Sequence, residues 1–153
     1  MSVTDKLKTL GIEVPALAGA FGLYVPARRV GGLIYVSGQL PMKEGTLIAA
    51  GPVPSRCSIE QAQAAARQCV INALGAVAAV EGTADRIAGV VRVGAFVASD
   101  ATFTEQPKVA NAASELLLQI FGDAGRHARA AVGTHVLPLD ASVEIEFIFA
   151  ATT

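Results

Sequence analysis

The sequence has few charged residues, no tryptophan and only two cysteines. Cys57 and Cys69 stand apart rather than in a CxxC motif, so they predict neither a metal site nor a redox pair. Their scarcity is typical of a protein in a reducing cytosol. Neither His127 nor His135 has the spacing of a metal ligand, and we therefore expect no metal ion.

No apolar run is long enough to cross a membrane, although apolar residues make up 52% of the chain and the mean hydropathy is +0.50. A spanning helix needs about 20 mostly apolar residues, and the most apolar stretch, residues 62–80, is interrupted by Arg67 and Asn72. The first residues lack the apolar segment of a secretory signal. We therefore expect a cytoplasmic protein without membrane contact, whose surplus apolar surface is buried between the subunits of an oligomer.

Positive charge is not concentrated in any block. The chain has twelve Lys and Arg and thirteen Asp and Glu, which gives a net charge of −1 and counts against nucleic acid as a partner. The GxSxG, P-loop and GxGxxG motifs are absent, so lipase, nucleotide and dinucleotide sites gain no support. A chain of 153 residues predicts a single domain that folds without a metal or a disulfide.

Apolar spacing predicts two long helices and several strands. An S-x-x-Q capping box at Ser58 and Gln61 begins the first long helix, and Gly82 ends it. The second begins near Pro107 and ends at Gly122. A short helix is predicted over residues 4–11. Strands are predicted over residues 22–27, 33–38, 46–50, 87–99, 129–137 and 143–150.

The predicted order of strands, helix, strand, helix and strands indicates an α+β fold with helices on one face of a sheet. In the last strand, Glu144 and Glu146 lie on the helix-free face, opposite an apolar set that packs on the helices: Val143, Ile145, Phe147 and Phe149. In the strand before it, alternation assigns Val132 and Val136 to the helix side and Arg129 to the opposite side. On this interpretation Arg129 and Glu144 share one face, near a cleft between subunits.

Arg129 is the strongest candidate for binding a ligand. Its guanidinium can hold a carboxylate through two parallel hydrogen bonds and stays charged at any working pH; a salt bridge, for instance to Glu146, is the competing interpretation. Glu144 can orient a water or act as a base if it is partly buried, or it is an ordinary strand residue. Ser37 and Gly38 end a strand where a hydroxyl and a backbone amide can approach a ligand, or where the chain simply turns.

Several segments together resemble the RidA (YjgF) family, from about Gly22 to the C-terminus. Residues 33–41, LIYVSGQLP, are similar to the family's strand ending in S-G-Q-[IL]-P, and residues 90–97 are similar to its central strand. The closing motif, R-x-x-V-x(4)-L-P-x(4)-[VI]-E-I-E, is matched by residues 129–146. Because this motif fixes residue types over a long span, it is specific.

The chain departs from the common pattern at a few positions. Leu23 and His127 stand where the family often has proline, and Ala131 stands where many members have cysteine. About twenty residues precede the matching region, and the loop over residues 42–58 is long. These features resemble a longer branch of the family, whose members are often named endoribonucleases.

The resemblance implies a chorismate-mutase-like α+β fold over residues 1–153, with a single-layer mixed sheet, two main helices on one face, and residues 1–20 as an extension. It implies a homotrimer with sites between subunits. It also implies hydrolysis of reactive enamines and imines, such as 2-aminoacrylate, to 2-keto acids and ammonia without a cofactor. The roles that it implies are carboxylate binding by Arg129, water orientation by Glu144, and substrate contacts by Tyr24, Ser37, Gly38 and Asn111.

Two other functions stay open. The same Arg129 pocket suits a non-catalytic trimer that binds a small carboxylate as a regulator. An endoribonuclease acting on single-stranded RNA is the other alternative, against which the neutral charge and the lack of aromatic stacking runs both count.

Overall fold

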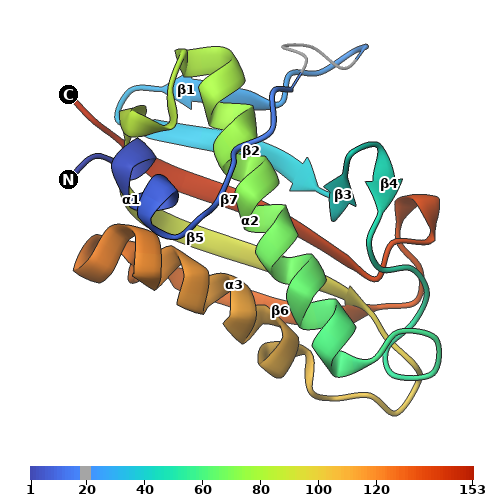
Figure 1. Ribbon diagram of the computed structural model, residues 1–153. Coiled ribbons are helices and arrows are strands. Elements are labelled where there is room, and N and C mark those ends of the chain that lie inside the picture. Colours follow the sequence, from blue (N-terminus) through green and yellow to red (C-terminus); the bar gives the residue numbers. More distant parts are fainter. Residues whose placement is uncertain (18–21) are drawn as a thin grey trace.

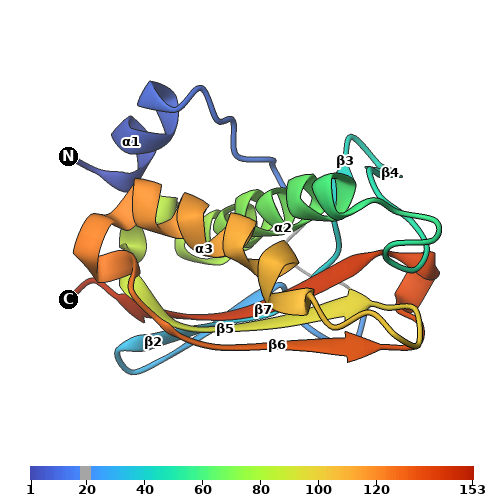
Figure 2. The same ribbon diagram turned by 90° about the horizontal axis from the view of Figure 1, so that it is seen from below.

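The computed structural model describes residues 1–17 and 22–153, so residues 18–20 of the predicted extension lie outside it. A five-stranded mixed sheet carries two long helices on one face, and Figures 1 and 2 show no α-helix of the described residues on the other face. This confirms the predicted α+β architecture. The strand order is β1 (Ala27–Val30), β2 (Leu33–Gln39), β7 (Val143–Ala151), β5 (Ile87–Ala98) and β6 (Ala128–Thr134).

Both long helices form where capping chemistry predicts them. α2 (Ile59–Glu81) begins at a complete capping box, in which Ser58 Oγ accepts from the Gln61 amide and the Gln61 side chain accepts from the Ser58 amide. It ends at Gly82, whose φ of 85° suits glycine. α3 (Gln106–Phe121) has proline in its first turn and ends at a glycine, as predicted.

The first predicted strand is wrong in position. Residues 22–26 form no strand; β1 starts at Ala27 and continues through Arg28 and Arg29 to Val30, with the turn at residues 31–32. The charged pair lies in an edge strand, where exposed charge is common because one side has no neighbour to pair with. Residues 46–50 contribute only β4 (Thr46–Leu47), paired with β3 (Met42–Lys43).

The core lies between the sheet and the two long helices. β7 confirms the predicted alternation, because its apolar residues Val143, Ile145, Phe147 and Phe149 are all at most 1% exposed. Glu144 and Glu146 point away from the helices. The sheet therefore keeps one face dry and presents acidic residues on the other.

The N-terminal extension packs on the helices. α1 (Val3–Thr9) is held to the 3-10 turn η1 (Ala84–Arg86), because the amide and hydroxyl of Thr4 both donate to Asp85 Oδ1, at 2.7 and 2.9 Å. The chain then crosses α2 (Figure 1). A Cβ on Gly75 would lie 2.7 Å from the Pro15 carbonyl oxygen, so glycine permits this close crossing. Within residues 1–17 and 22–153, no helix has the length and apolar character to cross a membrane.

Candidate functional site

Arg129 extends from β6 over α3, where two side chains hold it. Its Nη1 donates to Asn111 Oδ1 at 2.8 Å and to Ser114 Oγ at 3.2 Å. Asn111 and Ser114 are three residues apart on α3 and therefore share one helix face. The two neutral acceptors fix the guanidinium without neutralising its charge.

His127 supports this arrangement through its contact with Ser114. Its Nδ1 lies 2.6 Å from the Gly125 carbonyl oxygen, and its Nε2 lies 2.9 Å from Ser114 Oγ. Because a carbonyl oxygen only accepts, Nδ1 carries the proton in the neutral ring. Nε2 then accepts from the Ser114 hydroxyl, whose oxygen in turn accepts from Arg129. A chain of hydrogen bonds thus runs from the backbone to the guanidinium.

The charge of Arg129 has no partner of opposite sign among the described residues. Glu146, the alternative partner considered from sequence, is paired instead with Arg92 at 2.9 Å. Both hydrogen bonds of Arg129 that the structure defines come from Nη1. A guanidinium has five N–H donors, and two of them can hold a carboxylate through parallel hydrogen bonds.

The predicted face of Arg129 is wrong. Arg129 pairs with Val93 in β5, and Val93 pairs with Phe147 in β7. Directly paired residues point to the same side of a sheet, and Phe147 is buried against the helices. Arg129 therefore lies on the helix side, whereas Glu144, paired with Phe96, lies on the helix-free side.

The error has a physical cause. The sequence interpretation assigned Val132 to the helix side because valine was assumed to be buried within one chain. In the structure Val132 is 44% exposed on the helix-free face, and Ala131 packs on the core instead. Alternation misleads in an edge strand whose buried face carries small residues and whose other face keeps apolar ones.

Glu144 in the central strand β7 lies beside Gly38 in the neighbouring strand β2. A Cβ built on Gly38 would overlap Glu144 Oε1, so the carboxylate is packed against the bare backbone of β2. Pairing between β2 and β7 is irregular between Val36 and Gln39, which sets Ser37 and Gly38 out of the regular ladder. Partial burial, and then the nearby charge of Glu146, raise the pKa of Glu144.

Tyr24 and Ser37 lie near Gly38, the residue against which Glu144 packs. The Ser37 hydroxyl donates to the Val25 carbonyl oxygen at 2.7 Å, which ties β2 to the segment before β1. Tyr24, Ser37 and Gly38 all line one cavity of about 510 Å³. The structure therefore brings together three of the predicted substrate-contacting residues, with Glu144 behind Gly38.

The six predicted site residues thus form two separate groups. Arg129 and Asn111 make one group between β6 and α3, which we call the arginine group. The other, which we call the glutamate group, lies at the end of β2 and consists of Tyr24, Ser37, Gly38 and Glu144. Within one chain Arg129 and Glu144 lie on different faces of the sheet.

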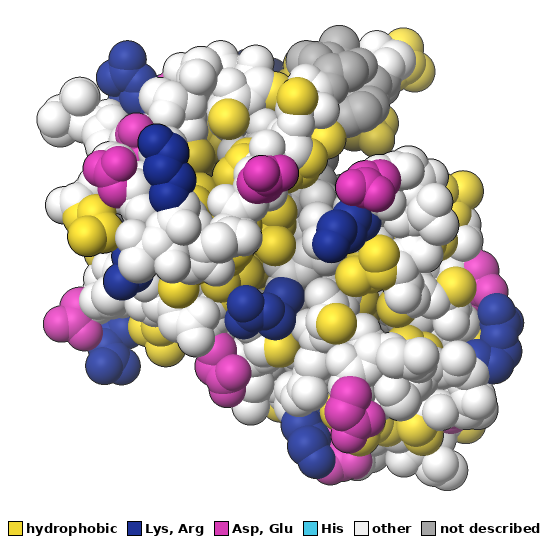
Figure 3. Space-filling model, in the orientation of Figure 1, with side chains coloured by type: hydrophobic (Ala, Val, Ile, Leu, Met, Phe, Trp, Pro, Cys, Tyr) yellow, Lys and Arg dark blue, Asp and Glu magenta, His cyan; other side chains and the backbone are white. Residues whose placement is uncertain are grey.

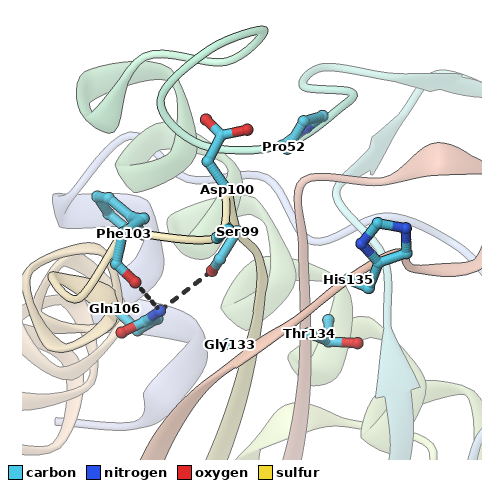
Figure 4. A pocket seen from close by; sticks show the side chains of 9 residues that line it. Pro52, Ser99, Asp100, Phe103, Gln106, Gly133, Thr134 and His135 are labelled. Carbon is cyan, nitrogen blue, oxygen red and sulfur yellow. Dashed lines mark hydrogen bonds between the residues drawn. The ribbon is translucent and has the colours of Figure 1, made fainter.

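A further cavity of about 470 Å³ lies at the carboxyl ends of β5 and β6 (Figure 4). The Gln106 amide nitrogen there donates to Ser99 Oγ and to the Phe103 carbonyl oxygen, at 3.2 and 2.8 Å. None of the predicted site residues lines this cavity. The helix side is also hollowed between the N-terminal segment and the β3–β4 hairpin, over about 680 Å³ (Figure 3).

Sequence reasoning missed Ser114 and His127 as partners of Arg129. One feature could have indicated Ser114: it follows Asn111 by three positions on a predicted helix. His127 lies two residues before Arg129, outside the predicted strand of residues 129–137. Within the described part of the chain, no group of three or more His, Cys, Asp or Glu side chains is arranged to hold a metal ion.

Residues 4–152 match the model of one protein family, described as "YjgF/chorismate_mutase-like, putative endoribonuclease". The chain belongs to this family. Protein TCP17 of Trypanosoma cruzi is 41% identical to this chain over 145 residues, covering 94% of this chain and 91% of TCP17.

Two solved structures are also closely similar. The protein Atu1372, of unknown function, from Agrobacterium tumefaciens is 41% identical with a TM-score of 0.88, over 99% of this chain and 93% of that one. A "putative endoribonuclease" from Shewanella oneidensis is 31% identical with a TM-score of 0.91, over 98% and 99% of the two chains. The similarity therefore includes the N-terminal extension as well as the YjgF core.

Proposed function

We propose that this protein hydrolyses reactive 2-imino acids and their enamine tautomers, such as 2-aminoacrylate, to 2-keto acids and ammonia. The observation that carries the proposal is the Arg129 guanidinium, which Asn111 and Ser114 orient and which no carboxylate of the described residues neutralises. A fixed, uncompensated guanidinium is the arrangement that binds the carboxylate of a small acid.

The reaction needs little beyond placement. Water adds to the electrophilic carbon of the C=N bond, the C–N bond of the resulting carbinolamine breaks, and one water is consumed for each ammonia released. Glu144 is suited to receive a proton from the attacking water, because its raised pKa makes it a better base than an ordinary carboxylate. Binding the substrate carboxylate at Arg129 and the attacking water at Glu144 lowers the entropic cost of bringing substrate and water together.

The proposal requires a second subunit. Since Arg129 and Glu144 lie on different faces of the sheet within one chain, we propose that Arg129 of one subunit meets Glu144 of the next in a homotrimer. The helix-free face supports such an interface, because Tyr35 and Val132 are 45% and 44% exposed on it. Contact with a neighbour would remove this apolar surface from water.

The experiment compares Arg129→Ala with Arg126→Ala. Arg126 is exposed and pairs with Asp123 three residues away, so its loss changes the charge equally without touching the proposed site. With freshly generated 2-aminoacrylate, we expect Arg129→Ala to lower kcat/KM at least about 100-fold, the effect of losing a charged hydrogen-bonded contact of about 3 kcal/mol. Equal rates for wild type and Arg129→Ala would refute the proposal.

A carboxylate-binding protein without turnover is the second candidate, and the same Arg129 group supports it. Saturable binding of pyruvate without hydrolysis of 2-aminoacrylate would establish it in place of the enzyme. The third candidate, endoribonuclease activity, has the relatives' names in its favour. Cleavage of single-stranded RNA that survives repurification and is lost in Arg129→Ala would establish that activity.

A further inference from the structure

The N-terminal segment forms one wall of the cavity that contains part of the glutamate group. The cavity lies between residues 15–17 and the end of β2, and Leu40 and Met42 add apolar surface to it. Its volume of about 510 Å³ is within the usual range of small-molecule sites. On one side it is lined by Pro15, Ala16 and Leu17, and on the other by Tyr24, Ser37 and Gly38.

This wall is fixed to the protein at several points. Ile12, Val14 and Leu17 pack on the core, and Pro15 crosses α2 at Gly75. Further back, α1 is tied to Asp85 by two hydrogen bonds. Ala16, in contrast, is exposed and lines the cavity, so the size of its side chain decides how much room the wall leaves.

The polar side chain at the base of the cavity is already engaged. The Asn72 amide nitrogen donates to the carbonyl oxygens of Leu40 and Met42, at 3.0 and 2.9 Å, and its oxygen accepts from Gln68. Asn72 therefore fixes the turn after β2 with its own polar atoms engaged, while Pro15, Leu40 and Met42 give the cavity apolar surface. Glu44 lines the cavity too, so a second negative charge on a ligand would be repelled.

We propose that this cavity receives the side chain of the substrate and selects 2-imino acids with a branched aliphatic side chain over the smallest ones and over dicarboxylic ones. The inference rests on the proposed function, since it places the reacting carbon beside Gly38 and Glu144. The carboxylate then lies on Arg129 of the neighbouring subunit, and the side chain extends along Ser37 toward Ala16.

The first measurement compares kcat/KM for the imino acids generated from leucine, alanine and aspartate by an amino acid oxidase. Each buried methylene group strengthens binding about fourfold, so we expect the leucine-derived substrate to exceed the alanine-derived one at least about tenfold. The aspartate-derived substrate is expected to be the poorest. A leucine-derived value no higher than the alanine-derived one would overturn the inference.

The second measurement adds bulk to the wall. Ala16→Leu is expected to reduce the ratio of the leucine-derived to the alanine-derived kcat/KM at least about fivefold, because it fills space that the longer side chain needs. Ala101→Leu is the matched control: it adds the same atoms at an exposed alanine of the cavity in Figure 4, which shares no lining residue with this one. An equal ratio in both variants would overturn the inference.

Calorimetric binding of two 2-keto acids separates this inference from the proposed function. We expect 4-methyl-2-oxopentanoate to bind at least about tenfold more tightly than pyruvate, with the difference lost in Ala16→Leu. If this preference is found without turnover, the enzyme proposal fails and the cavity assignment stands. If turnover is found but neither keto acids nor imino acids are discriminated by size, the cavity assignment fails alone.

Discussion

Arg129 and Glu144 point to opposite faces of one sheet, Arg129 from the edge strand β6 and Glu144 from the central strand β7. The face of each residue is fixed by its partner in β5, the strand between them: Arg129 pairs with Val93, and Glu144 pairs with Phe96. No side-chain movement within the chain can bring both groups to one small substrate. The proposed chemistry therefore depends on assembly.

Replacing Ser114 with alanine is expected to raise KM about tenfold with little change in kcat. The Ser114 hydroxyl accepts from Arg129 and links it to His127, and a hydrogen bond to a charged group contributes about 1.5 kcal/mol. Steady-state kinetics on 2-aminoacrylate measure the split. Ser114→Thr keeps a hydroxyl and should restore KM; an alanine variant with unchanged KM would show that Arg129 needs no such support.

Replacing Gly38 with alanine is expected to lower kcat/KM about 100-fold, because moving a catalytic group by about 1 Å has an effect of that size. The added Cβ would overlap the Glu144 carboxylate and force it to move. Gly32→Ala is the control, since Gly32 lies before the same strand with open space around it. Kinetics that change equally in the two variants would contradict the role given to this contact.

The pH profile of kcat/KM is expected to fall on the acid side as Glu144 becomes protonated. Burial raises the pKa of Glu144 and Glu146 raises it further, so activity should be lost at a higher pH than for an ordinary carboxylate. Glu146→Gln removes the repelling charge and should move the acid limb to lower pH. An acid limb that stays in place or moves upward would exclude Glu144 as the titrating group.

Docking of α1 is expected to weaken in acid. Hydrogen bonds from the Thr4 amide, and then its hydroxyl, lower the pKa of Asp85 against the opposing effect of burial. The stabilisation is therefore complete above the ordinary aspartate pKa of about 3.9 and is lost as pH falls through the lowered value. An NMR titration of the Thr4 amide shift measures this, with Asp85→Asn as a variant that should show no such titration.

Much of the fold follows from local chemistry in the sequence. The Ser58–Gln61 capping box, the glycine at position 82 and the alternation in β7 each have one dominant physical reading, and all three are confirmed. β1 was misplaced because its register is decided by pairing with β2, which no local pattern encodes. Arg28 and Arg29 favour a turn when read from the sequence alone, because charge in a strand is common only at the edge of a sheet, where β1 lies.

The site was only partly predictable for a related reason. The resemblance of the closing motif predicts that Arg129 and Glu144 act together, but the face of each depends on what covers the sheet. Val132 is apolar and yet 44% exposed, so its hydropathy does not indicate which face of the strand packs on the core. Ser114 was missed because its contact with Arg129 arises only when α3 packs across β6.

Mixing two inactive variants tests the composite site most directly. Arg129→Ala and Glu144→Gln subunits are unfolded together in equal amounts, refolded, and assayed for hydrolysis of 2-aminoacrylate. If each site takes Arg129 from one subunit and Glu144 from another, random assembly leaves about one quarter of the sites intact, and about one quarter of wild-type activity should return. Activity no higher than that of the separate variants would contradict the account.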